Sequence, residues 1–200
     1  MKKSNVSALT RLAILTALVF VLQFWGITIK IGPTSFSLVL VPIAIGAMLC
    51  GPGAGAFLGF IFGAITLWGG ISGGDFFTAT LFNAQPFATA VICLGKGILA
   101  GFVPGVIYKA LKNVNDFAAS VVAALSAPIV NTGLFVLGCF FLVSETLNAN
   151  LANFGVAEGT TLVYFVFIGC AGLNFVAEFL VNTLLSPAIH RIIKAVDKHI

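Results

Sequence analysis

One stretch of the chain decides which kind of fold is possible: Asn83-Ala-Gln-Pro-Phe-Ala-Thr-Ala-Val-Ile-Cys-Leu-Gly-Lys-Gly-Ile-Leu-Ala-Gly101. Polar residues around Pro86 lead into an apolar segment of helical character, and Lys96 lies about ten residues inside that segment. An ammonium group at the centre of a membrane span costs roughly 2.5–3.5 kcal/mol on insertion scales. Lys96 therefore needs a partner, a hydrated cavity or a ligand.

The composition is that of an integral membrane protein. Of the 200 residues, 60% are hydrophobic and 8% are charged, and the mean hydropathy is +1.13. A soluble domain carries about 25% charged residues, so this chain lacks the polar surface that folding in water requires. At about 20 residues per span, the length predicts an all-α, compact bundle of six transmembrane helices that forms a single domain over residues 1–200.

Six apolar segments mark the expected spans. The first is longer than the apolar core of a signal peptide, so we expect it to be retained. Residues 27–31 alternate apolar and polar side chains, which predicts an extended stretch. Residues 72–86 mix aromatic and amide side chains, which suits a lid. The expected spans are about 9–25, 36–50, 54–71, 87–111, 117–143 and 162–189.

The positive charges predict the orientation of the bundle. Eight of them fall on one side of the predicted topology, whereas Lys30 alone falls on the other side. Because cytoplasmic loops carry an excess of Lys and Arg, both termini are expected in the cytoplasm and the stretches 26–35, 72–86 and 144–161 outside. The eight residues are Lys2, Lys3, Arg11, Lys109, Lys112, Arg191, Lys194 and Lys198.

Small residues recur at a spacing of four along three of the expected spans. Ala13 and Ala17 form a notch in the first span. Gly51, Gly55, Gly59 and Gly63 form one glycine stripe, and Gly97, Gly101 and Gly105 form another. Such stripes let neighbouring helices approach closely, so we interpret them as packing surfaces.

Two ionisable residues of opposite sign lie inside the expected membrane region. Lys96 is in the fourth span, and Glu178 is in the sixth, on one helix face with Asn174 and Asn182. One interpretation is an ion pair that joins the two spans. The other is a polar pocket, open to the outside, in which one or both charges contact a ligand; intramembrane charges are functional by default.

Other polar and aromatic residues extend this candidate site. Asn131 adds an amide to the fifth span, although it also suits a backbone carbonyl freed by Pro128. Trp68 suits either the site or a membrane interface. Asn83 and Gln85 are expected at the outer mouth. The candidate substrate-binding residues are Lys96, Glu178, Asn131, Asn174, Asn83, Gln85 and Trp68.

The remaining ionisable residues and the cysteines have simpler interpretations. Asp75 is expected to be a solvated loop charge, and His190 and His199 to be solvated in the basic tail. The four cysteines all fall in or at the end of apolar segments, where they behave as small hydrophobic residues. Their spacing predicts neither a disulfide framework nor a metal site.

Enzymatic motifs are absent from the sequence. Gly95-Lys96 is not followed by Ser or Thr, so it is not a phosphate-binding loop. Neither His-Glu-x-x-His nor Gly-x-Ser-x-Gly occurs. We therefore expect no catalytic residues, cofactor or metal, and the positive charge indicates topology rather than nucleic-acid binding. Active transport would draw on an ion gradient or on another subunit.

The chain resembles the substrate-binding S components of energy-coupling factor (ECF) vitamin transporters. The resemblance rests on length and topology, on the Ala13-x-x-x-Ala17 notch, on the region from Phe36 to Gly63 and on Lys96-Gly97 with Ala100-Gly101. It covers about residues 9–111 well and the second half mostly by topology.

The resemblance implies a high-affinity vitamin pocket in a multi-pass protein of a bacterial plasma membrane. It implies lids after spans 1 and 3, and walls from spans 4, 5 and 6. It also implies that Ala13 and Ala17 dock on a transmembrane subunit, which works with two separately encoded ATPases. Such S components are thought to topple within the membrane to release the vitamin.

The chemistry of the candidate site suggests an acidic ligand. A buried lysine suits a carboxylate as a point charge, and amides with Glu178 suit hydroxyl and N–H groups. Pantothenate fits best, with folate and cobalamin as alternatives. The rival functions are a small secondary transporter or channel without an ATPase partner, and an intramembrane enzyme or assembly factor.

Overall fold

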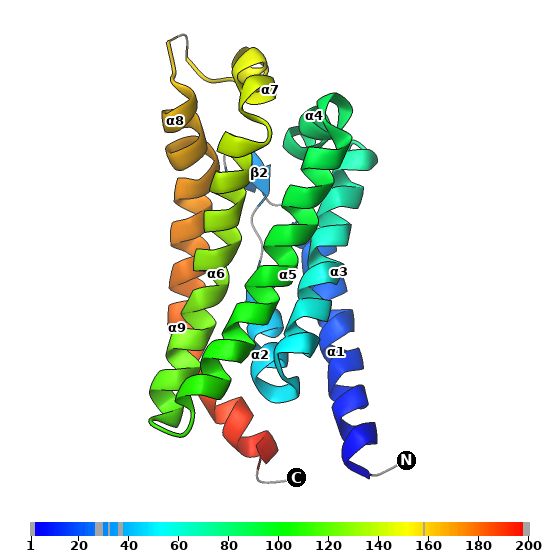
Figure 1. The fold of residues 1–200 in the computed structure, drawn as a ribbon, viewed down its shortest axis with the longest axis vertical. Coiled ribbons are helices and arrows are strands. Elements are labelled where there is room, and N and C mark those ends of the chain that lie inside the picture. Colours follow the sequence, from blue (N-terminus) through cyan, green and yellow to red (C-terminus); the bar gives the residue numbers. More distant parts are fainter. Residues whose placement is uncertain (1–2, 27–29, 32, 36–37, 158, 198–200) are drawn as a thin grey trace.

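The protein is an all-helical bundle in a computed structural model that describes residues 3–26, 30–31, 33–35, 38–157 and 159–197. Four long helices run along it, and a fifth column is built from α8, the π-helix η2 and α9 (Figure 1). The elements of these five columns are α1 (Lys3–Gly26), α3 (Pro52–Ile71), α5 (Pro86–Leu111), α6 (Asp116–Phe141), α8 (Leu162–Tyr164), η2 (Phe165–Gly172) and α9 (Leu173–Asp197).

Short elements complete the bundle. The strands β1 and β2 form an antiparallel hairpin that pairs Ile31 with Thr34. β1 falls within residues 27–31, which were predicted to be extended; residues 27–29 lie outside the described part. The short elements are β1 (Lys30–Ile31), β2 (Thr34–Ser35), α2 (Leu40–Cys50), α4 (Phe76–Ala84), α7 (Ser144–Ala149) and η1 (Leu151–Phe154).

Five helical segments in the described part of the chain are long and apolar enough to cross a membrane. The membrane class of the fold is therefore confirmed. The segment expected at 36–50 contains only the 11 helical residues of α2, about 16 Å of helix against a hydrocarbon core of about 30 Å. Because α2 alone is too short to cross, six crossings remain a prediction.

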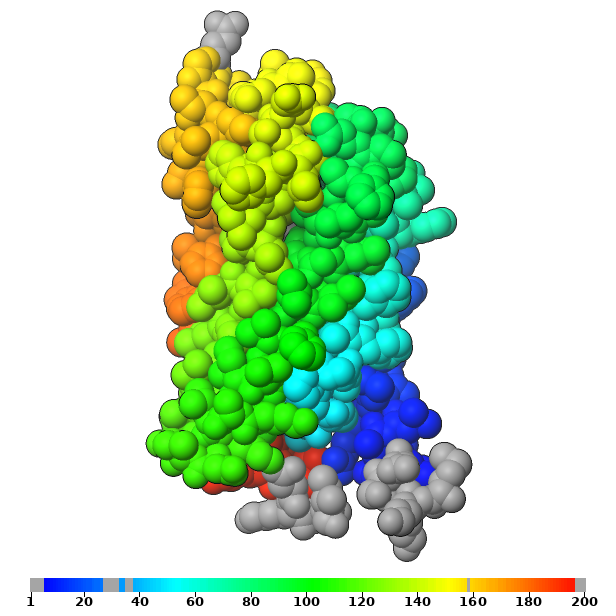
Figure 2. Space-filling view, in the orientation of Figure 1, coloured from blue at the N-terminus to red at the C-terminus, as the bar shows by residue number. Residues whose placement is uncertain are grey.

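Both chain ends lie at the same end of the bundle, where α1 begins and α9 ends (Figure 1). We call the opposite end, which carries α4, α7 and α8, the distal end. In the space-filling view of Figure 2, α5 runs along the face of the molecule between α3 and α6. This places Lys96 of α5 between two neighbouring helices.

The glycine stripes are packing surfaces between α3 and α5. A Cβ atom on Gly59 would overlap the Gly97 carbonyl, and one on Gly55 would overlap the Gly101 carbonyl. The preceding turn begins at Gly51, whose φ of 94° is a left-handed conformation that favours glycine. The predicted packing role is confirmed for the stripes except at Gly51, where a Cβ would meet nothing within 4 Å. The close approach of the two helices fixes where α5 presents Lys96.

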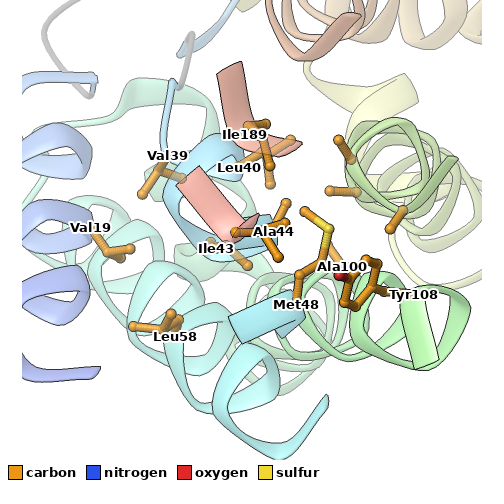
Figure 3. Close-up of a cluster of buried hydrophobic side chains, with 14 of the residues drawn as sticks. Val19, Val39, Leu40, Ile43, Ala44, Met48, Leu58, Ala100, Tyr108 and Ile189 are labelled. Atoms are coloured by element: carbon orange, nitrogen blue, oxygen red, sulfur yellow. The ribbon is translucent and has the colours of Figure 1, made fainter. Parts of the chain in front are cut away.

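A buried cluster around α2 fills the half of the bundle nearest the termini. Leu40, Ile43 and Ala44 of α2 are fully buried and lie among side chains of α1, α3, α5 and α9 (Figure 3). A second cluster, which includes Phe77, Leu81 and Phe165, fills the distal half. α2 is therefore a buried core helix, and its packing against the surrounding helices stabilises the position of a helix of only 11 residues.

Two expectations about ionisable residues are wrong. Asp75 is 5% exposed and caps α4, accepting a hydrogen bond from the Thr78 backbone N–H (3.3 Å); the stretch 72–86 is largely helical rather than a loop. His190 is buried as well. Its Nδ1 lies 3.0 Å from Ser120 Oγ on α6. His199 lies outside the described residues.

Candidate functional site

A polar cavity lies inside the helical bundle. It encloses about 660 Å³ of space when the open solvent at its mouth is included. Its walls come from α1, α3, α4, α5, α6, η2 and α9 and from the β1–β2 hairpin. Segments from the whole length of the chain thus meet at one site.

Four of the predicted binding residues line this cavity. They are Lys96 of α5, Asn131 of α6, and Asn174 and Glu178 of α9. Asn174 and Glu178 are four residues apart, so they share one face of α9. Asn182 continues that face but is not among the lining residues; its Nδ2 donates to the Glu178 backbone carbonyl (2.8 Å).

The other three predicted residues lie outside the cavity lining. Gln85, at the start of α5, donates from Nε2 to Thr146 Oγ1 of α7 (3.0 Å), so it joins two distal elements. Trp68 is 60% exposed on α3, which suits the interfacial alternative. Asn83 is exposed near the end of α4.

The ammonium group of Lys96 lies between two aromatic rings. Its Nζ is 5.5 Å from the ring centroid of Phe62 on α3 and 5.3 Å from that of Phe135 on α6, within the range of cation–π attraction. Among the residues that the structure describes, no carboxylate oxygen lies within 4.0 Å of this nitrogen. The direct ion pair with Glu178 is therefore not formed in this structure.

Glu178 and Asn131 are connected across the cavity wall. Asn131 Nδ2 donates a long hydrogen bond to Glu178 Oε2 (3.5 Å). The amide nitrogen of Asn131 therefore donates toward α9, and not to a backbone carbonyl freed by Pro128. Its Oδ1 is buried and has no hydrogen-bond partner within the described part of the chain. A buried acceptor without a partner costs about 1–3 kcal/mol, which a ligand donor would recover.

Several hydroxyl and amide groups in the cavity were not predicted. Gln23 of α1 donates to Thr66 of α3 (3.1 Å), and both residues line the cavity. Thr78 and Asp75 of α4 line it too, and the Thr78 hydroxyl donates to Asp75. The sequence could have indicated Gln23 as a cavity residue, because it is a lone amide in an apolar span. Threonines carry no such signal because they bond to their own helix, as Thr66 does with the Phe62 carbonyl (2.9 Å).

The π-helix η2 exposes a carbonyl to the cavity wall. The Cys170 carbonyl accepts from Thr34 Oγ1 (2.8 Å) and from Asn174 Nδ2 (3.2 Å). Asn174 also donates to the Thr34 hydroxyl. All three residues line the cavity, so these bonds fasten the β1–β2 hairpin to its wall. Single π turns often occur at functional sites.

An aromatic cluster adjoins the cavity, and two of its rings, Phe77 and Phe135, line it. The ring centroid of Phe77 on α4 lies 5.8 Å from that of Phe135, 5.3 Å from that of Phe154 in η1 and 6.5 Å from that of Phe165 in η2. We call these four residues the aromatic cap. Because Phe135 also contacts Lys96, the cap continues directly into the charged part of the site.

The predicted docking notch lies on the outer surface of α1. Ala13 and Ala17 are both exposed. They line an apolar groove with Leu12, Thr16 and Phe57 of α3. The small side chains leave room for a neighbouring helix to approach α1.

Comparison with known proteins identifies the family. Residues 7–189 match the family described as "ECF transporter, substrate-specific component". The pantothenic acid transporter PanT of Lactococcus lactis subsp. cremoris (strain MG1363) is 28% identical over 166 residues, which cover 76% of this chain and 82% of the relative. The apolar helices and the internal polar cavity agree with a membrane subunit that binds a substrate. The chain belongs to the family of substrate-specific components of ECF transporters.

Proposed function

We propose that the chain is the pantothenate-binding S component of an ECF importer. The observation that carries this proposal is the ammonium group of Lys96, held by two aromatic rings in a polar cavity. With no described carboxylate oxygen within 4.0 Å, the lysine is available to an acidic ligand. The likeness to a pantothenic acid transporter supports pantothenate as that acid.

The chemistry of pantothenate suits the groups that line the cavity. Its single carboxylate would bind the Lys96 ammonium as a charge-assisted pair. Its hydroxyl and amide N–H groups are donors, and the buried Asn131 Oδ1 is an acceptor for one of them. Glu178 and Asn174 lie on the same helix face and supply further polar atoms. In this proposal Asn83, Gln85 and Trp68 do not touch the vitamin.

The charge of the cavity lining favours a ligand with one carboxylate. Pantothenate carries one carboxylate, whereas folate carries two. Only one lysine lines the cavity among the described residues, which matches a single carboxylate.

The proposal includes a topology and partners. The chain crosses a bacterial plasma membrane six times with both termini in the cytoplasm, as the charge bias indicates. The exposed pair Ala13 and Ala17 docks on the ECF transmembrane subunit. Two separate ATPase subunits supply the energy for transport. The sequence of this chain itself has no phosphate-binding loop.

Direct binding tests the proposal. The protein is purified in detergent without added vitamin, and small molecules released on denaturation are identified by mass spectrometry. Vitamin-free protein is then titrated calorimetrically with pantothenate, folate and cobalamin. We expect co-purified pantothenate and tight binding of pantothenate alone. Binding of another vitamin with no heat from pantothenate would overturn the assignment.

A further inference from the structure

We infer that Phe62 and Phe135 are positioning residues, which hold the Lys96 ammonium toward the ligand cavity without neutralising it. Phe62 belongs to α3 and Phe135 to α6, and Lys96 lies on α5 between these helices. The distances from Nζ to the two ring centroids are nearly equal, 5.5 and 5.3 Å. All three side chains line the cavity.

Aromatic faces can stabilise a buried lysine without neutralising its charge, which a carboxylate cannot do. A carboxylate partner within the bundle would compete with the acidic group of a ligand, and separating such a buried pair is costly. A ring face attracts the cation through its quadrupole and leaves its net charge in place. The rings therefore stabilise the Lys96 ammonium before a ligand binds and leave its charge available to an incoming anion.

The backbone holds Phe62 in place. Phe62 is 3% exposed, and Gly59 and Gly63 precede and follow it on α3. A Cβ on Gly59 would overlap the Gly97 carbonyl, and one on Gly63 would overlap the Cys93 carbonyl. The absence of side chains at these glycines brings α3 against α5 on both sides of Lys96. The ring of Phe62 is thereby brought within reach of the ammonium group.

Phe135 connects the lysine to the aromatic cap. Its ring contacts Lys96 and also lies 5.8 Å from the ring of Phe77, which is 3% exposed on α4. The packing of Phe135 against Phe77, another ring of the aromatic cap, limits the rotamers of Phe135. The direction from which an anion approaches Lys96 is thus set by two rings rather than by the flexible lysine stem.

The test compares the binding affinities of pantothenate, an acid, and pantothenol, the corresponding alcohol. The inference rests on pantothenate as the ligand, and pantothenol replaces the pantothenate carboxylate with a neutral hydroxymethyl group. Phe135→Leu should weaken pantothenate binding about tenfold, as expected for a desolvated cation–π contact, and pantothenol binding less than about twofold. Phe135→Tyr, which keeps the ring, should retain both affinities. Equal losses for the two ligands in Phe135→Leu would show a merely structural role and overturn the inference.

A matched control removes a ring from the same helix. Phe140 also belongs to α6, and its ring centroid lies 5.8 Å from that of Phe167 in a tilted arrangement. Phe140→Leu should leave both affinities unchanged. Phe62→Leu should repeat the effect of Phe135→Leu. Unchanged pantothenate affinity in Phe62→Leu and Phe135→Leu, with folding intact, would also overturn the inference.

A second measurement needs no ligand. Lysines are reductively methylated with ¹³C, and the Lys96 signal is assigned by its loss in Lys96→Met. Ring currents from Phe62 and Phe135 should shift this signal upfield of the exposed lysines, and Phe135→Leu should reverse part of the shift. An unshifted Lys96 signal overturns the positioning role. Failure of the wild type to bind pantothenate, with the shift present, overturns the proposed ligand instead.

Discussion

Asn131 of α6 donates a hydrogen bond to Glu178 of α9, with 3.5 Å between Nδ2 and Oε2. Both residues are buried, and both line the polar cavity. The bond is long, and the Asn131 Oδ1 atom has no hydrogen-bond partner among the described residues. This pair is therefore a part of the cavity wall with an unsatisfied acceptor on Asn131, which the vitamin would satisfy in the proposed function.

Asn131→Ala should weaken pantothenate binding more than it affects folding. The lost acceptor is worth about 1–1.5 kcal/mol to a bound ligand, which corresponds to about a tenfold lower affinity in calorimetry. The melting temperature should hardly change, because the substitution also removes an unsatisfied buried atom. Asn115→Ala is the contrasting control, since Asn115 caps α6 through the Ala118 N–H (3.0 Å). It should lower stability by about 1 kcal/mol with the affinity unchanged.

Lys96→Met should abolish the preference for an acid. Removing one partner of a desolvated charge pair costs about 2–5 kcal/mol, so pantothenate affinity should fall at least about 30-fold while pantothenol affinity is retained. Lys109→Met alters a lysine of the same helix that is exposed in the last turn and should bind normally. Pantothenate binding that survives Lys96→Met would contradict the assigned role of this lysine.

Two glycines on either side of Lys96 should respond differently to the same substitution. A Cβ on Gly97 would overlap the Gly59 carbonyl, whereas a Cβ on Gly95 meets nothing within 4 Å. Gly97→Ala should therefore destabilise the protein by about 3 kcal/mol through overpacking, and Gly95→Ala should be neutral. Thermal unfolding in detergent measures both. Equal stability of the two variants would contradict the close packing of α3 on α5.

The sequence was sufficient for the all-helical membrane class, for the glycine-mediated packing and for the family, whereas six crossings remain a prediction. Charges and amides inside apolar spans are rare and costly, so Lys96, Asn131, Asn174 and Glu178 were conspicuous, and all four line one cavity. The stripes were equally visible, because a spacing of four places small residues on one helix face. The match of residues 7–189 to the ECF family confirms the resemblance.

The remaining features depend on tertiary structure. The short length of α2 was hidden because an apolar sequence does not separate a crossing helix from a buried one. Asp75 resembles a solvated loop residue until the α4 helix that it caps is known. Phe62 and Phe135 are ordinary apolar residues in their own spans, and only the packing of three helices brings their rings to Lys96.

Filling the α1 notch with larger side chains should separate vitamin binding from assembly. Ala13→Leu with Ala17→Leu fills the exposed groove and should prevent co-purification with an ECF transmembrane subunit, because close helix approach needs small side chains. Pantothenate binding by the isolated chain should be unchanged. Ala8→Leu is the control, since Ala8 is also exposed on α1 but points away from the notch. Intact assembly in the double variant would contradict docking at this surface.

Thr34→Val should accelerate release of the bound vitamin. The Thr34 hydroxyl fastens the β1–β2 hairpin to the Cys170 carbonyl (2.8 Å), and valine keeps the shape without this bond. Loss of about 1 kcal/mol should raise the dissociation rate about fivefold in stopped-flow experiments and leave the association rate nearly unchanged. Thr80→Val is the matched control, because its hydroxyl bonds the Phe76 carbonyl of its own helix (2.8 Å). An unchanged dissociation rate in Thr34→Val would show that the hairpin does not retain the ligand.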